Sequence, residues 1–101
     1  MVSPPRAGGA VSTRTFIPHR CHEAIGVLGA VSVATACLFE DSPGADAATI
    51  ADRSAPISIE HPTGHFDCVF EFEADGSPAR AGVVRTARKL FDGTVYPRED
   101  L

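Results

Sequence analysis

The sequence predicts a single α+β domain in which antiparallel strands wrap around one central, apolar helix. Residues 24–39 (AIGVLGAVSVATACLF) contain no charged side chain and many small ones, and a helix that is apolar on all sides is normally buried on all sides. Residues 57–61 and 66–73 largely alternate between apolar and polar side chains, as half-buried strands do. A chain of 101 residues holds at most one small domain.

The N-terminal residues predict a lead-in followed by a first strand. Residues 1–10 are rich in proline and glycine and offer little to bury, which is typical of a flexible segment. Residues 11–17 (VSTRTFI) are rich in β-branched side chains and predict a strand, which Pro18 ends. We therefore expect the domain to span residues 11–97, with a short tail at 98–101.

The apolar stretch predicts a helix that begins between His19 and His22 and ends near Phe39 or Glu40. Glu23 would then lie in the first turn, where a negative charge suits the helix dipole. Residues 41–56 predict a loop with one short turn near residues 47–52.

The C-terminal half predicts short strands joined by turns such as Pro62-Thr63-Gly64. These strands are too few to surround a helix of this length, so we expect further strands outside this sequence. The expected strands are 57–61, 66–73, 79–90 and 94–97.

Composition excludes several classes of partner. The net charge is −4 and basic residues form no block, so nucleic acid is not an expected partner. The apolar stretch falls short of the roughly 20 residues that span a bilayer, so we expect no membrane insertion. The three cysteines form no CxxC pair, which favours reduced thiols in a cytoplasmic protein. Residues 34–37 (ATAC) also resemble a lipoprotein cleavage site, and a small secreted lipoprotein cleaved before Cys37 is an alternative.

A cluster of basic and titratable side chains at the expected helix start is a candidate anion site: His19, Arg20, Cys21 and His22. A helix N-terminus offers N–H donors and partial positive charge to a carboxylate or phosphate. The same surroundings would lower the pKa of Cys21, which makes this thiol a candidate acid–base group. The alternative is a solvated helix end with incidental histidines.

A second cluster contains His61, His65 and Cys68. Together with the first cluster it has enough nitrogen and sulfur donors for zinc, but the spacings match no standard zinc motif. Cys68 lies on the apolar face of its strand, which favours core packing, so we expect no metal and no other cofactor.

Three blocks of sequence resemble, in the right order, the C-terminal half of the PrpF-type isomerases. They are residues 13–37 (TRTFIPHRCHEAIGVLGAVSVATAC), 57–68 (ISIEHPTGHFDC) and 81–97 (AGVVRTARKLFDGTVYP). That family includes 2-methylaconitate isomerase and 4-oxalomesaconate tautomerase. The FIPHR lead and the VLGAVSVATAC helix resemble the tautomerase branch more closely.

The resemblance implies a diaminopimelate-epimerase-like fold, of which this chain would be part of the second half. Each of two similar halves wraps antiparallel strands around a central helix, and an unsaturated di- or tricarboxylate binds between the halves. A proton then moves between carbon atoms without metal or organic cofactor. The family's acid–base pair, a lysine and a cysteine, would lie in the first half. Cys21 is not identified as the equivalent of that cysteine, so no catalytic residue carries over to this chain.

The resemblance also implies a set of binding residues. His22, Ile25 and Gly26 would line the substrate pocket, and His19 and Arg20 would add positive potential. The expected function is a fragment of an isomerase that tautomerises a 4-oxalomesaconate-like oxo-tricarboxylate and is inactive without the missing N-terminal half. A fragment of 2-methylaconitate cis–trans isomerase is the alternative enzyme.

Overall fold

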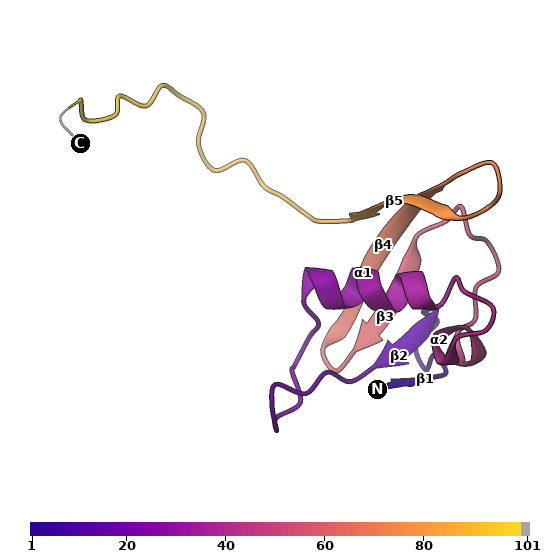
Figure 1. Cartoon of the computed structure of the whole chain (residues 1–101). Coiled ribbons are helices and arrows are strands. Elements are labelled where there is room, and N and C mark those ends of the chain that lie inside the picture. The colour runs from indigo at the N-terminus through magenta and orange to yellow at the C-terminus, as the bar shows by residue number, and fades with distance from the viewer. Residues whose placement is uncertain (100–101) are drawn as a thin grey trace.

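The computed structural model describes residues 1–99, which form one five-stranded sheet and two helices (Figure 1). This confirms a mixed α+β fold. The strands lie side by side in the order in which they occur in the chain. The elements are β1 (Val2–Ser3), β2 (Val11–Thr13), α1 (Val27–Ala36), α2 (Pro43–Ala47), β3 (Ile57–His61), β4 (Gly64–Phe72) and β5 (Pro78–Val83).

The sheet is mixed, so the expectation of antiparallel strands alone is wrong. β3 pairs with β4, and β4 with β5, in antiparallel fashion, but β2 and β3 run parallel, with Val11 opposite Ile59. Parallel neighbours need a crossover connection. The segment that carries α1 and α2 supplies it.

The core lies between α1 and the middle of the sheet. The largest fully buried side chains are Val11 on β2, Ile57 and Ile59 on β3, and Cys68 on β4. α1 contributes alanines to this core, and short side chains let the helix backbone approach the sheet closely. The predicted alternation along β4 is confirmed, because Cys68 is buried whereas its neighbour Val69 is exposed.

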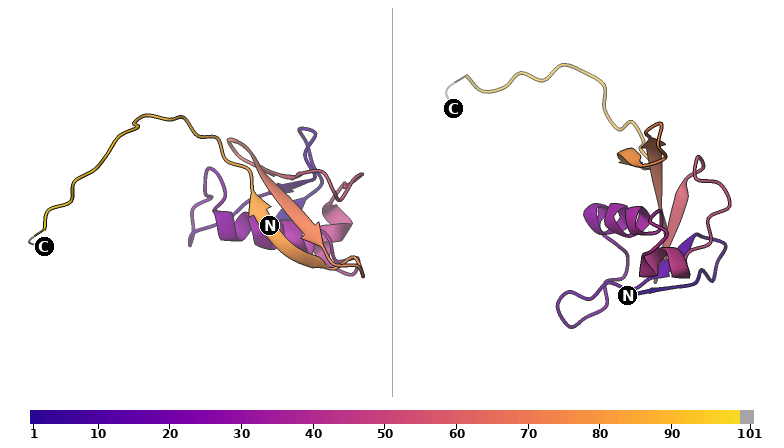
Figure 2. Two further views of the ribbon diagram at one scale, coloured as in Figure 1. Left: turned by 90° about the horizontal axis from the view of Figure 1, so that it is seen from above. Right: turned by 45° about the vertical axis from the view of Figure 1, so that its right-hand side comes forward.

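Helix α1 is covered on one side only. Among residues 1–99, α1 packs against β3, β4 and β5 and against α2, and it lies across one face of the sheet (Figures 1 and 2). Leu28 is 84% exposed and Val27 44% exposed on the opposite side. The prediction of a central helix surrounded by strands is therefore not met in this part of the chain, and the diaminopimelate-epimerase-like arrangement stays a prediction.

Helix α1 also begins later than expected. Its N-cap is Gly26, in an extended conformation, and the expected start between His19 and His22 is wrong. Those residues form a turn in which the Ile17 N–H donates to the Arg20 carbonyl (2.9 Å) and the His22 N–H to the Thr15 carbonyl (2.6 Å). These local bonds occupy backbone groups that a longer helix would need.

The other boundaries differ modestly. Helix α2 lies just before the expected turn at residues 47–52, and residues 48–52 are not helical. It begins where the Ser42 hydroxyl accepts from the Ala45 N–H (3.0 Å). β5 ends at Val83 rather than at residue 90. Residues 85–99 form an extended arm without the expected strand at 94–97, and the arm leaves the body of the molecule (Figures 1 and 2).

The first ten residues contact the sheet, although we expected a flexible lead-in. β1 pairs with β2, Val2 lying opposite Thr13. Ala10 is buried, and its N–H donates to the Ser58 carbonyl (2.8 Å). The domain limits at residues 11 and 97 stay a prediction. In the described chain, neither helix has the length and apolar character needed to cross a bilayer.

Candidate functional site

The predicted binding residues lie in the loop that precedes α1. His19, Arg20, Cys21 and His22 are all exposed there, as is the N-cap Gly26. The chain thus keeps them near the start of the helix, although none of the four belongs to its first turn.

Ile25 differs from the other predicted residues because it is only 7% exposed and belongs to the core. A Cβ added at Gly29 would lie 3.5 Å from Ile25 Cγ1, so this side chain folds back against the first turn of α1. Ile25 therefore anchors the loop to the domain immediately before the helix begins.

The start of α1 is exposed and carries no charged side chain. The first helical hydrogen bond runs from the Ala30 N–H to the Gly26 carbonyl (2.8 Å). No side chain among residues 1–99 caps the N–H groups that precede it, and the first turn, VLGA, carries only apolar side chains. Unpaired N–H groups and the positive end of the helix dipole favour a carboxylate or phosphate at this place.

The turn between β3 and β4 is joined to this loop. The Thr63 hydroxyl donates to the Glu23 carbonyl (2.7 Å) across 40 residues of sequence. This bond places the Pro62-Thr63-Gly64 turn, which directly follows His61, beside Glu23 in the loop before α1. Both the cluster before α1 and the cluster at His61 could be identified from the sequence, but their proximity could not.

Two imidazoles at this junction are held in the same way. His22 Nδ1 accepts from the Ala24 N–H (2.9 Å), and His61 Nδ1 accepts from the Thr63 N–H (3.3 Å). A neutral imidazole that accepts at Nδ1 carries its proton on Nε2. Each ring can therefore offer an Nε2–H donor to a ligand oxygen.

The three cysteines divide into one exposed thiol and two buried ones. Cys21 is exposed, and its thiol donates to the His22 carbonyl (3.6 Å). Burial, assisted by the negative charge of Asp67, raises the pKa of Cys68 to about 11, and burial also raises the pKa of Cys37. Cys37 and Cys68 are therefore neutral core residues.

The zinc alternative finds no support in the described residues, where no three His, Cys, Asp or Glu side chains are arranged to hold a metal ion. His65 Nδ1 lies 2.9 Å from Asp67 Oδ1, Cys68 is enclosed in the core, and His61 is engaged with Thr63.

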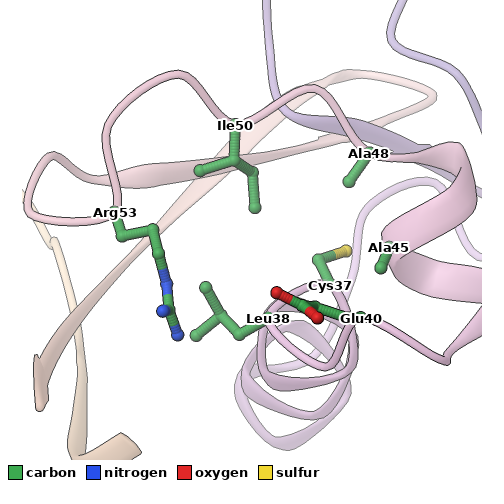
Figure 3. A pocket seen from close by; sticks show the side chains of 7 residues that line it. All are labelled: Cys37, Leu38, Glu40, Ala45, Ala48, Ile50 and Arg53. Carbon is green, nitrogen blue, oxygen red and sulfur yellow. The ribbon is translucent and has the colours of Figure 1, made fainter. Parts of the chain in front are cut away.

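A separate hollow of about 240 Å³ lies at the other end of α1 (Figure 3). The Arg53 guanidinium group, one of its walls, stacks 4.6 Å from the centre of the Phe72 ring. The C-terminal end of a helix carries partial negative charge, so this hollow is a poorer carboxylate site than the start of α1. Its lining residues are Cys37, Leu38, Glu40, Ala45, Ala48, Ile50 and Arg53.

The fold and the site together define a mixed α+β domain whose main helix begins at an exposed glycine without a side-chain cap. The family model described as PrpF protein matches residues 6–98, and the chain belongs to the PrpF family. It is 56% identical over 97 residues to the (4E)-oxalomesaconate Delta-isomerase of Novosphingobium sp. (strain KA1), a match that covers 95% of this chain and 27% of that protein. It is 53% identical over 97 residues to the 4-oxalomesaconate tautomerase of Pseudomonas putida, covering 94% and 26%. The chain thus spans about a quarter of the length of these relatives.

Proposed function

We propose that this chain is part of an isomerase that tautomerises a 4-oxalomesaconate-like oxo-tricarboxylate by proton transfer. The observation that carries the proposal is the identity of 56% and 53% to two relatives whose names state reactions on oxalomesaconate. Those names favour oxalomesaconate over 2-methylaconitate as the substrate. A cytoplasmic location and the absence of a cofactor stay predictions.

The role we assign to this chain is to bind one carboxylate of the substrate at the start of α1. The uncapped N–H groups that follow Gly26 would donate hydrogen bonds to the carboxylate oxygens. The Nε2–H groups of His22 and His61 would donate from the side, and His19 and Arg20 would add positive potential. Such donors would also stabilise negative charge that develops on the substrate during proton transfer.

The proton transfer itself we assign to residues outside this chain. The relatives are about four times longer, and Cys21 lies in the loop before the helix rather than within it. Because catalysis needs donor, acceptor and substrate held together, we expect the chain alone to be inactive.

Binding can be tested on the 101-residue chain by two-dimensional amide NMR with trans-aconitate, an unsaturated tricarboxylate. We expect saturable shifts confined to residues 22–29 and 61–64, and we expect sodium chloride at equal ionic strength to produce none. His22→Gln should weaken binding, whereas the matched variant His65→Gln should not. Shifts spread evenly over the chain, or none at all, would contradict the site.

Activity can be tested with a chimera in which this chain replaces the matching quarter of the Novosphingobium isomerase. We expect the chimera to isomerise 4-oxalomesaconate, as followed by absorbance, and the chain alone to show no turnover. An inactive chimera that still folds would argue against the proposed function. Turnover by the chain alone would refute the assignment of proton transfer to the missing part.

A further inference from the structure

A buried carboxylate on β3, that of Glu60, is enclosed by the backbone of the N-terminal segment. The Glu60 side chain is only 6% exposed. The Arg6 N–H donates to Oε2 (2.8 Å), and the N–H groups of Ala7 (2.6 Å) and Gly9 (3.0 Å) donate to Oε1. All three donors are more than 50 residues away from Glu60 in sequence.

The backbone of residues 6–9 is shaped for this ligand. Gly8 has a φ of +82°, a conformation that L side chains rarely adopt. A Cβ on Gly9 would lie 2.7 Å from Glu60 Cγ and 3.0 Å from the Ser58 carbonyl oxygen. Gly8 thus permits the turn, and Gly9 permits the close approach of the loop to Glu60 and Ser58. Neighbouring N–H groups that converge in this way form an anion-binding concavity.

The surroundings favour the ionised form of Glu60. The Arg6 amide does most to lower the pKa of Glu60, desolvation opposes it, and the amides of Gly9 and Ala7 and the charge of Arg14 add to the lowering. Beside the carboxylate lies a hollow of about 300 Å³ that is also lined by His65, whose ring contacts Asp67.

We propose that residues 6–9 form a carboxylate-binding loop whose ligand in this chain is the side chain of Glu60, and that this contact holds β1 on the sheet. β1 is a short edge strand that pairs with β2 through Val2 with Thr13 and Ser3 with Ser12. Met1 and Arg14 extend this pairing by two hydrogen bonds of 3.0 Å. Hydrogen bonds to a charged acceptor are stronger than neutral backbone bonds, so the three bonds to Glu60 add substantially to the attachment of this short edge. Without the Glu60 side chain, the loop is an unoccupied site for a small carboxylate.

The test uses Glu60→Ala, with sodium acetate as the external carboxylate. We expect the amide protons of Arg6, Ala7 and Gly9 to exchange about tenfold faster or more in this variant, as follows from the loss of a hydrogen bond to a charged group. Acetate should slow that exchange in a saturable manner, and sodium chloride at equal ionic strength should not. Wild-type exchange rates in Glu60→Ala, or an acetate effect no larger than that of chloride, would overturn the proposal.

Two further variants keep the proposal testable should Glu60→Ala fail to fold. Glu60→Gln keeps the size of the side chain but places an NH₂ group against one of the donors, so at least one of the three amides should lose its slow exchange. Glu71→Gln makes the same change at an exposed glutamate on β4 and should leave all three unchanged. Unchanged amides in Glu60→Gln would count against the loop as a carboxylate site.

Discussion

Gly26 leaves the start of α1 without a side-chain acceptor, although Ser, Thr, Asp and Asn are the residues usually found at this position. The helix gives up a stabilising cap as a result. The same N–H groups remain available to a ligand, so one residue links the stability of α1 to its proposed function.

Gly26→Asp should therefore separate stability from binding. An aspartate at the N-cap should raise the free energy of unfolding by about 0.5 kcal/mol, and nothing lies within 4 Å of the added Cβ. Its carboxylate would accept hydrogen bonds from the N–H groups and repel trans-aconitate, so we expect binding to weaken about tenfold or more, measured by NMR titration.

Gly26→Asn is the matched control, because it caps the helix without adding charge. It should weaken trans-aconitate binding less than Gly26→Asp does. Equal affinity of Gly26→Asp and the unmodified chain would show that the helix start is not the binding site.

The exposure of the three cysteines predicts how fast each thiol reacts with an alkylating reagent. Iodoacetamide should modify Cys21 in the native chain. Cys37 and Cys68 should react at least about tenfold more slowly than Cys21, because they are buried and the thiolate is the reactive form. Mass spectrometry of peptides after timed quenching measures this. All three should react alike in denaturant, and equal rates in the native chain would contradict the core described here.

The kinds of residue in the site could be predicted from sequence, but their mutual placement could not. His22 and the turn at Thr63 were both identified, yet the bond between Thr63 and Glu23 joins segments 40 residues apart, which no local pattern encodes. Glu60 was not identified at all. In the run ISIEH it alternates like an exposed strand residue, and the amides that bury it come from the distant N-terminal segment.

At the scale of elements, small residues set the distances between α1 and its neighbours. Ala30 and Ala34 are fully buried against the sheet. Gly44, in α2, lies so close to the end of α1 that an added Cβ would be 3.1 Å from the Ala36 carbonyl carbon and from the Cys37 nitrogen. The contact between the two helices therefore depends on the absence of a side chain.

Two glycine-to-alanine substitutions should have opposite effects on stability. Gly44→Ala should lower the free energy of unfolding by about 1–3 kcal/mol, because the new methyl group meets backbone that cannot move aside easily. Gly29→Ala should raise it by about 1 kcal/mol through helix propensity, since its Cβ would meet Ile25 only at an ordinary 3.5 Å. Urea denaturation measures the free energy of unfolding of both variants. A change of the same sign in Gly44→Ala and Gly29→Ala would contradict the packing described here.

Sequence predicted those elements whose signals are local. β3, the turn at Thr63 and β4 were expected within two residues of their observed bounds, because alternation and turn residues mark them directly. The start of α1 could not be predicted from the sequence, because the hydrogen bonds of residues 15–22 compete with the helix. The parallel pairing of β2 with β3 depends on where the crossover returns, which local patterns do not specify.

At the scale of the whole molecule, burial is concentrated in the middle of the sheet. β3 pairs on both sides and carries two of the largest fully buried side chains, Ile57 and Ile59. In contrast, the arm at residues 85–99 is exposed along its whole length. Local stability should follow this gradient.

Hydrogen exchange should show the gradient directly. We expect the amides of β3 and of the β4 residues that pair with it to exchange slowest, and those of residues 86–99 to exchange at rates close to those of an unstructured peptide. Mass spectrometry or NMR on the dilute chain makes the comparison. Strong protection in the arm at low protein concentration would mean that it packs against the body of the domain.

The parallel pairing of β2 with β3 also determines when the chain can fold during synthesis. Val11 is synthesised before both helices and its partner Ile59 after them, whereas β3, β4 and β5 are joined by short turns. Contacts that close a long loop form slowly compared with hairpins. A nascent chain would thus leave the β3-facing edge of β2 unpaired until β3 leaves the ribosome, and a ribosome paused before residue 57 would carry an open, aggregation-prone intermediate.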